Sequence, residues 1–190
     1  VPQLTSLEKS MVMRTQAVAA LRVQKWDAAV EALESLVGSS DVPQTDKRPL
    51  LESLINASLQ LKDPARVVKW SRQYLQAGGS NPSVHLAMVQ SLAASGQHAE
   101  VVKVVLEKIR LDASTAKKTP EPELRTLAIS YRQLKDDVGY VNTLKQLLSN
   151  YPSKAYWAEV LGRMSQQVGL NARLELDLYR LLEQTDNMED

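Results

Sequence analysis

The sequence contains no cysteine and no phenylalanine, and glycine and proline are sparse. Without cysteine the chain can form no disulfide, bind no metal through thiolates and use no thiol as a nucleophile. This absence leaves the compartment open, because periplasmic chains can also lack cysteine. Without phenylalanine, the core must be filled by leucine, valine and alanine, with tyrosine and tryptophan as its large aromatic residues.

Long apolar runs and an excess of one charge are also missing. No run approaches the roughly 20 apolar residues that a membrane-spanning helix needs, and no signal peptide is recognisable. The formal net charge is only +1, with lysine and arginine spread along the chain. A nucleic-acid-binding module normally shows a basic face. We therefore expect no nucleic-acid partner and no direct membrane insertion.

Residues typical of active sites are equally few. His85 and His98 are the only two histidines, and their spacing across a helix-to-turn step does not favour a shared metal. The sequence has no glycine-rich phosphate loop, no HExxH motif and no Gly-x-Ser-x-Gly motif. We therefore expect no catalytic activity, no metal and no cofactor.

What the chain does have is a set of short helix-breaking segments that recur at a nearly constant interval. Each breaker separates two apolar stretches of helical length, and helix-forming residues dominate the composition. A period in the thirties with two helices per unit is typical of an α-solenoid. We therefore predict an all-α fold of about five antiparallel helix pairs, with units at 7–40, 47–79, 81–111, 121–152 and 153–185. The equivalent breaker positions are Trp26, Pro64, His98, Asp137 and Leu170, which lie 38, 34, 39 and 33 residues apart.

Local signals mark several helix boundaries. Asp63 precedes Pro64, and an aspartate side chain can cap a helix whose first position tolerates proline. Asn81 and Pro82 repeat the same arrangement. Gly78 is expected to end the preceding helix, because glycine accepts the left-handed conformation found at helix ends.

Two irregular segments are predicted between the units. A polar loop through Pro43 and Asp46 is expected to lead to a helix that opens near Pro49. The segment from Asp112 to Pro122 contains serine, threonine, lysine and proline, which favour a loop. We expect it to be an enlarged loop between units and the most mobile part of the chain.

Individual residues resemble the tetratricopeptide repeat (TPR) family, whose units are two antiparallel helices. In the first unit Ala29 and Leu33 match the family pattern, and in the last unit Trp157 and Val160 resemble its Trp and Leu positions. The small residue that the family has early in the second helix is replaced by larger residues in most later units, so the repeats are degenerate. In the fourth unit the matching residues are Leu144, Leu147, Leu148 and Pro152.

The resemblance implies a right-handed solenoid that forms a single repeat domain over residues 7–185. Segments 151–157 and 173–180 also look similar to exported TPR proteins of Gram-negative bacteria. This favours a periplasmic or exported location over a cytoplasmic one. Because the sequence starts at Val1 rather than at methionine, we expect it to be a fragment of a longer chain.

The resemblance also implies where a partner binds, since in TPR proteins the first helix of each unit lines the concave surface. Polar and cationic residues there can hydrogen-bond an extended peptide or hold an acidic side chain. They equally fit the alternative of ordinary solvated helix faces. TPR domains that hold chaperone C-termini use a Lys/Asn/Lys/Arg clamp, of which the chain supplies the asparagine without the lysines, so that role is not expected. The predicted partner-binding residues are Arg14, Asn56, Gln90, Arg125 and Ser130.

Together these features predict a non-catalytic scaffold or adaptor that binds a protein or peptide in a groove. One alternative is a structural spacer or self-association module, which light scattering over a range of concentrations would reveal. The other is a regulatory segment of a larger enzyme, which the full-length open reading frame would reveal.

Overall fold

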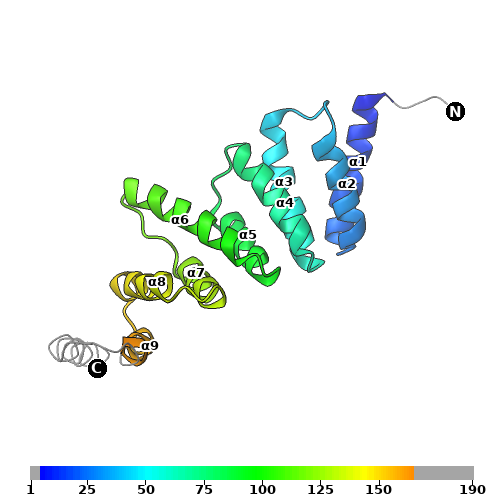
Figure 1. Cartoon of the computed structure of the whole chain (residues 1–190). Coiled ribbons are helices and arrows are strands. Elements are labelled where there is room, and N and C mark those ends of the chain that lie inside the picture. Colours follow the sequence, from blue (N-terminus) through cyan, green and yellow to red (C-terminus); the bar gives the residue numbers. More distant parts are fainter. Residues whose placement is uncertain (1–4, 165–190) are drawn as a thin grey trace, which may run out of the picture. The chain divides into compact units, whose positions relative to one another are not determined.

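The computed structural model describes residues 5–164, and over this range the chain is entirely α-helical and turn. Within residues 6–94 and within residues 98–164, successive helices pack against one another and are joined by turns and loops (Figure 1). The described helices are α1 (Ser6–Arg22), α2 (Trp26–Gly38), α3 (Gln44–Gln60), α4 (Pro64–Gln76), α5 (Pro82–Ala94), α6 (His98–Ser114), α7 (Glu121–Gln133), α8 (Asp137–Asn150) and α9 (Lys154–Met164).

These helices belong to two compact units. The first unit, Val1–Gln97, contains α1 to α5, and the second unit, His98–Asp190, contains α6 to α9. The boundary falls between α5 and α6, inside the unit that the sequence predicts at residues 81–111. The breaker at Leu170 and the later part of the last predicted unit lie outside the described residues. A single continuous array over residues 7–185 therefore stays a prediction.

The core of the first unit follows the helical period of its apolar residues. Ala29, Leu33 and Leu36 form the predicted stripe of α2, and all three are buried. Leu54 and Ile55 of α3 are almost completely buried in the same apolar core. Side chains three and four residues apart share one face of a helix. The spacing in the sequence thus selects the faces that pack together.

The second unit uses leucine in the same way. Leu124 and Leu127 of α7 are buried, as are Leu144 and Leu147 of α8. Each pair is three residues apart, so each helix presents one apolar face. Val160 of α9 is buried as well.

The breakers are left-handed turns that end the first helix of each pair. Two residues before each of the four described breaker positions the backbone has a positive φ: 57° at Gln24, 54° at Lys62, 71° at Gly96 and 58° at Lys135. In the second breaker the Asp63 N–H donates to the Ser58 carbonyl (3.1 Å), which satisfies a carbonyl at the end of α3. The periodicity in the sequence is therefore a periodicity of helix ends.

Three of these four left-handed residues are not glycine, and this is a source of strain. Replacing Lys62 by glycine is expected to raise the free energy of unfolding by about 1 kcal/mol, because glycine has no Cβ to clash at positive φ. Urea denaturation of the full chain measures the change. The matched control is Gln73→Gly in the exposed face of α4, which should lower the stability by about 1 kcal/mol. If Lys62→Gly and Gln73→Gly changed the free energy of unfolding by the same amount in the same direction, the strain assigned to Lys62 would be contradicted.

Side-chain caps start the helices where the sequence predicts them. The Asp63 Oδ1 atom accepts the Arg66 N–H (3.0 Å) at the start of α4. The Asn81 Oδ1 atom accepts the Ser83 N–H (3.0 Å) at the start of α5. Pro64 and Pro82 occupy the first helical positions, where no backbone N–H is needed. Both local predictions are confirmed.

A tyrosine fixes the start of α5. The Tyr74 hydroxyl donates to the Glu52 Oε1 atom (2.6 Å) and accepts the Asn81 N–H (3.2 Å). Its ring also covers Gly79, where a Cβ would lie only 2.2 Å from a ring carbon. These contacts link α3, the end of α4 and the cap of α5.

The helix that was expected to open near Pro49 begins earlier. It starts at Gln44, so Asp46 lies in its first turn and Pro49 lies inside α3. Asp46 favours a helix N-terminus through the helix dipole. Pro49, the sixth residue of α3, removes the one backbone hydrogen bond to the Thr45 carbonyl, and the helix continues on both sides of it. The prediction of a loop through Asp46 was wrong for these two reasons.

The predicted loop from Asp112 to Pro122 also needs correction. Helix α6 continues to Ser114, and Asp112 is a buried residue within it. The Asp112 carboxylate forms an ion pair with Lys108 and accepts the Thr119 hydroxyl (3.1 Å). The Thr119 carbonyl in turn accepts the Tyr151 hydroxyl (3.0 Å). The segment is thus tied to both α6 and the end of α8.

Candidate functional site

The candidate site lies in the first unit, where the apolar face of α3 is wider than its packing requires. Leu51, Leu54 and Ile55 are buried, but Leu59 at the end of the helix keeps 39% of its surface exposed. Asn56 is exposed one turn before Leu59, so the two residues lie on neighbouring parts of one helix surface. An apolar side chain is thereby left next to a polar one.

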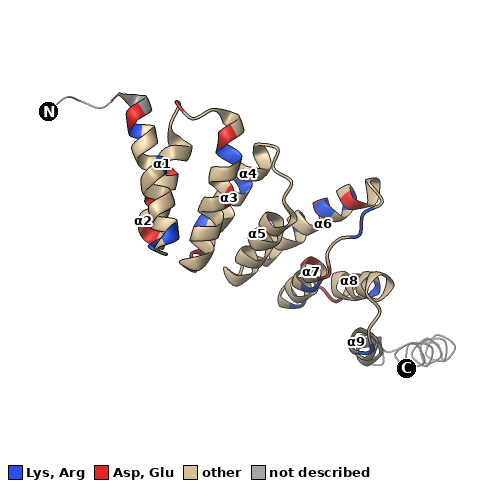
Figure 2. Cartoon of the chain, turned by 180° about the vertical axis from the view of Figure 1, so that it is seen from behind, with Lys and Arg blue, Asp and Glu red and all other residues tan. Residues whose placement is uncertain are grey.

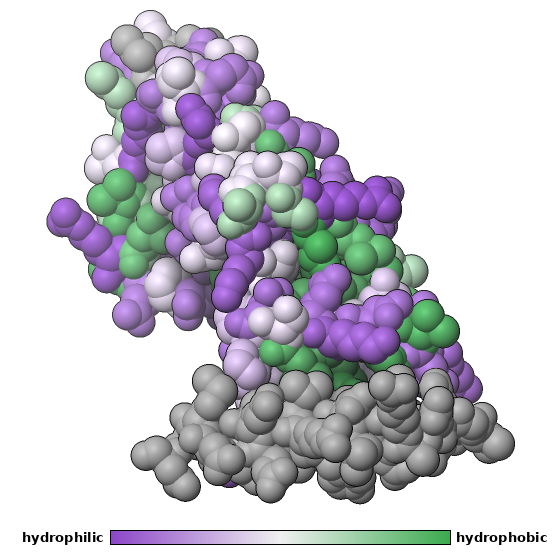
Figure 3. Space-filling view, turned by 90° about the vertical axis from the view of Figure 1, so that its left-hand side faces the viewer, coloured by the Kyte–Doolittle hydropathy of each residue, from purple (hydrophilic) through white to green (hydrophobic). Residues whose placement is uncertain are grey.

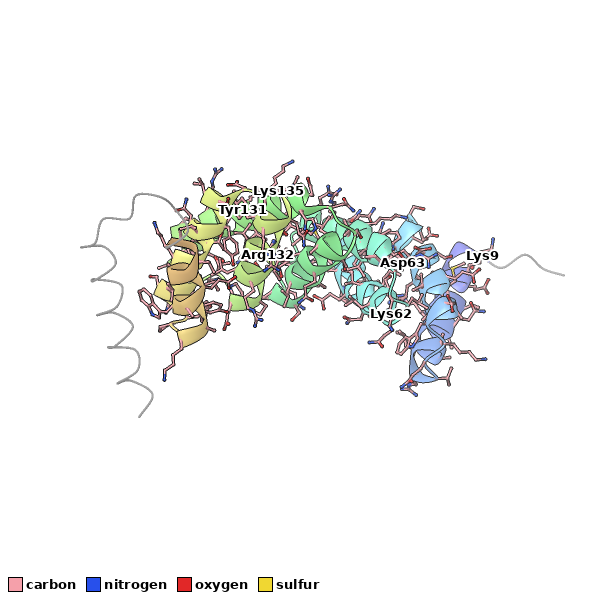
Figure 4. The ribbon with its side chains drawn as sticks, turned by 60° about the horizontal axis from the view of Figure 1, so that its bottom comes forward. Lys9, Lys62, Asp63, Tyr131, Arg132 and Lys135 are labelled. Carbon is pink, nitrogen blue, oxygen red and sulfur yellow. The ribbon has the colours of Figure 1, made fainter. Side chains whose placement is uncertain are left out.

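The turn after α3 places charged groups beside this apolar surface. Asp63 caps α4 and also approaches the Arg66 guanidinium, with 3.6 Å between Oδ2 and Nε. The same Arg66 Nε atom lies 3.6 Å from the Glu34 Oε1 atom, which accepts the Trp70 indole N–H (3.2 Å). Among residues 5–164, by contrast, the Lys62 ammonium has no hydrogen-bond or ion-pair partner. Figure 4 labels Lys62 and Asp63 in this turn.

Between this turn and α5 lies an open pocket of about 290 Å³, which we call the α3–α5 pocket. Leu59, Val67 and Ala94 give it an apolar lining, and Lys62 and Gln90 are exposed polar residues of its wall. The pocket is formed by Leu59, Lys62, Asp63, Pro64, Val67, Gln90, Ser91 and Ala94.

Helix α5, which forms one wall of the pocket, carries no aspartate, glutamate, lysine or arginine. Figure 2 shows it free of both charge colours. Asp63 and Glu34 lie near the same Arg66 guanidinium, so two carboxylates share one cation. Lys62 is the charged residue of the α3–α5 pocket whose side chain has no partner among the described residues.

The structure places three of the predicted binding residues on first helices of the first unit. Gln90 of α5 is exposed and lines the α3–α5 pocket, and Asn56 of α3 is exposed. Arg14 of α1 is exposed too, but its Nη2 atom forms an ion pair with the Asp46 Oδ2 atom of α3 (2.9 Å). An exposed ion pair of this kind contributes little to stability, about 1 kcal/mol at most. It does, however, engage the cation that was predicted for a partner.

The other two predicted residues belong to α7 in the second unit. Arg125 is exposed. Ser130 is fully buried, and its hydroxyl lies 3.3 Å from the His98 Nδ1 atom. A buried serine with a side-chain partner does not line a surface, so we leave Ser130 out of the proposals below.

Several pocket residues were missed by the sequence analysis. Leu59 was one of many apolar residues in a wide stripe, and nothing in the pattern marked it as exposed. Lys62 stood in a breaker and was assigned only to a turn. A usable signal was the combination of an apolar stripe wider than one helix face with an uncharged first helix in the following helix pair.

Exposed apolar side chains alone do not define a site. Apolar residues in the face shown in Figure 3 lie in separate patches among hydrophilic ones, and scattered apolar residues are normal for a protein surface. Leu59 differs because it lines a hollow. The large apolar residues exposed among the described ones are Met11, Val12, Val18, Val23, Leu59, Leu111, Ile129, Leu134 and Val138.

The second unit contains tyrosines with perturbed ionisation. Burial and a hydrogen bond from the Tyr156 hydroxyl to the Glu121 Oε1 atom (2.6 Å) raise the pKa of Tyr156 to about 12. Burial also raises the pKa of Tyr131, with a further contribution from the charge of Asp136. These groups join helices rather than face a ligand: the Tyr156 bond connects α9 to α7.

The Tyr156 pKa predicts alkaline destabilisation. Above pH 10.0, the ordinary value, the unfolded chain loses a phenol proton that the folded chain keeps up to about pH 12. The contribution of Tyr156 to stability should therefore be constant below pH 10 and fall as the pH rises towards 12. In Tyr156→Phe the unfolding free energy should fall less steeply with pH over that window, as measured by urea denaturation at stepped pH. If the unfolding free energies of the wild type and of Tyr156→Phe fell equally steeply between pH 10 and pH 12, the raised pKa of Tyr156 would be contradicted.

The described residues show neither a metal site nor a membrane-spanning helix. Within residues 5–164 no three His, Cys, Asp or Glu side chains are grouped to hold a metal ion. His85 is buried in α5, and His98 contacts Ser130. None of the helices in this range has both the length and the apolar character needed to cross a bilayer.

Comparison with known proteins identifies the fold. No family model and no curated protein match the sequence. Among solved structures, the chain is similar to MamA RS-1 (13% identity, 96% of this chain and 97% of that chain covered, TM-score 0.56) and to MamA MSR-1 (11%, 96% and 99%, 0.56). It is also similar to the nearly identical TPR-like repeats of a Podospora anserina kinesin light chain (18%, 96% and 98%, 0.54). Likeness at such low identity defines architecture only, and it confirms the predicted class: the chain has an all-α, TPR-like solenoid fold.

Proposed function

We propose that the chain is a non-catalytic scaffold that binds a segment of another protein along the first helices of its helix pairs. The observation that carries the proposal is the surface of the first unit, where exposed Asn56, exposed Gln90 and the α3–α5 pocket occur together on α3 and α5. Side-chain amides both donate and accept hydrogen bonds. They therefore suit the backbone of an extended peptide.

The mechanism relies on a surface that is formed before binding. Both helices are fixed by buried leucines and by the Tyr74 contacts with Glu52 and Asn81. On binding, the partner segment loses conformational freedom, whereas the scaffold loses little conformational freedom because its surface is already formed. Such preorganisation lowers the cost of association.

Partner capture by variants tests this proposal. The double variant Asn56→Glu/Gln90→Glu should lose partners that the wild-type chain retains from a native extract. The control Gln73→Glu/Gln76→Glu makes the same chemical change on exposed positions of α4 and should retain them. Quantitative mass spectrometry of the captured proteins gives the comparison. Identical partner profiles for all three proteins would overturn the proposed surface.

Self-association is the second candidate, and the outer face of α1 favours it. Met11, Val12 and Val18 of this helix are 60%, 44% and 51% exposed, respectively. Met11 and Val18 lie seven residues apart and therefore share one face of the helix. Light scattering over a range of concentrations separates the two candidates. A mass that rises with concentration, and that Met11→Glu/Val18→Glu holds at the monomer value, would favour self-association; a strict monomer would exclude it.

A further inference from the structure

We propose that the α3–α5 pocket takes one aliphatic side chain of the partner, and that Lys62 binds a carboxylate next to that side chain. The partner segment would thus be acidic with an aliphatic anchor. This inference rests on the proposed function, because it describes the segment that the scaffold binds. The pocket and Lys62 would select for particular side chains of the partner, whereas Asn56 and Gln90 are proposed to bind only its backbone.

The lining of the pocket argues for a side chain. Its volume of about 290 Å³ lies at the lower end of the roughly 300–1,000 Å³ typical of ligand pockets and is ample for one aliphatic side chain. Leu59, Val67 and Ala94 supply apolar walls without an aromatic ring. An aliphatic side chain placed between them would remove its own surface and that of the exposed Leu59 from water, which is favourable.

The charge at the pocket argues for an acidic neighbour. Among the described residues, the Lys62 ammonium has no partner, whereas the Asp63 carboxylate is engaged by the Arg66 N–H and guanidinium. The α5 wall is uncharged. A carboxylate of the partner can therefore pair with the Lys62 ammonium without displacing an existing partner. Such complementarity acts mainly on specificity and on the association rate.

Two variants separate the parts of the proposal. Ala94→Phe fills the pocket from an exposed position, and Ala28→Phe on the exposed face of α2 is its control. Lys62→Gly removes the cation at a residue with φ 54°, so folding is not impaired. Its control is Lys135→Gly, which makes the same change at φ 58° in the turn after α7 (Figure 4).

The experiment uses a displayed library of random twelve-residue peptides, selected on the immobilised wild-type chain. Peptides that combine an aliphatic residue with a neighbouring Asp or Glu should be enriched. Fluorescence anisotropy with the enriched peptide should show about tenfold weaker binding to Ala94→Phe and to Lys62→Gly. Ala28→Phe and Lys135→Gly should bind like the wild-type chain. The affinity for Lys62→Gly should also be insensitive to replacing the peptide's acid by its amide.

Failure of this inference can be distinguished from failure of the proposed function. If the enriched peptides bind Ala94→Phe and Lys62→Gly as tightly as the wild type but lose affinity for Asn56→Glu/Gln90→Glu, the pocket assignment is overturned and the scaffold function stands. Enrichment of basic peptides would overturn the role of Lys62. If no peptide is enriched on the wild-type chain, both the pocket and the binding of an extended segment are contradicted.

Discussion

Replacing Leu54 by alanine is expected to lower the free energy of unfolding by about 3 kcal/mol. Leu54 has no exposed surface and lies on the face of α3 that packs into the core of the first unit. Truncating it removes apolar contacts and leaves a cavity that rigid helices cannot close completely. Urea denaturation followed by circular dichroism measures the loss.

The control for this prediction is Leu59→Ala, five residues further along the same helix. Leu59 keeps 39% of its surface exposed and borders the α3–α5 pocket, so its truncation should cost less than about 1 kcal/mol. The same change should weaken peptide binding, because it removes one wall of the pocket. If both variants lost the same stability, Leu59 would be a core residue and the pocket would not be open.

Replacing Asp112 by alanine is expected to destabilise the chain by about 2–3 kcal/mol. Its carboxylate is buried between the Lys108 amine and the Thr119 hydroxyl, and the Thr119 carbonyl accepts the Tyr151 hydroxyl. The change removes the ion pair and leaves the buried Thr119 hydroxyl without this acceptor. Chemical denaturation measures the loss, and hydrogen exchange should show the opening at residues 112–120.

A double-mutant cycle with Lys108→Ala isolates the ion pair. The pair is partly shielded from water, since the side chains of Lys108 and Asp112 are 24% and 6% exposed. Its coupling energy should therefore exceed about 1 kcal/mol. A value of about 0.4 kcal/mol, typical of exposed helix pairs, would show that Asp112 acts only through Thr119.

The helices and the spacing of their ends could be predicted from the sequence. The spacing of apolar residues indicates the helices, and the breaker positions indicate where the helices end. The stripe Ala29, Leu33 and Leu36 is buried as its period requires. The cap at Asp63 follows from an aspartate placed before a proline. In both cases the physical cause lies within a few neighbouring residues.

Features that depend on residues far apart in the sequence could not be predicted. Asp112 was assigned to a loop from the composition of residues 112–122, whereas the order of this segment depends on the Tyr151 hydroxyl, which donates to the Thr119 carbonyl from 32 residues away. Similarly, the burial of Ser130 follows from its contact with His98, 32 residues away. Local composition carries no information on such pairings.

The same reasoning explains what the sequence revealed of the candidate site. Gln90 was placed on a first helix from the TPR resemblance, and it lines the α3–α5 pocket. The pocket itself needs three segments to meet: the end of α3, the start of α4 and the end of α5. Its cation, Lys62, was visible only as part of a turn. Binding at these residues stays a proposal.

The most direct test of the central claim is hydrogen exchange of the wild-type chain with and without the peptide selected in the display experiment. Binding along α3 and α5 predicts slower exchange at the end of α3, at the turn through Lys62 and Asp63, and in the last turn of α5. The matched turn at Lys135 should exchange at the same rate in both samples. Protection confined to the second unit, or no protection at saturating peptide, would contradict the account.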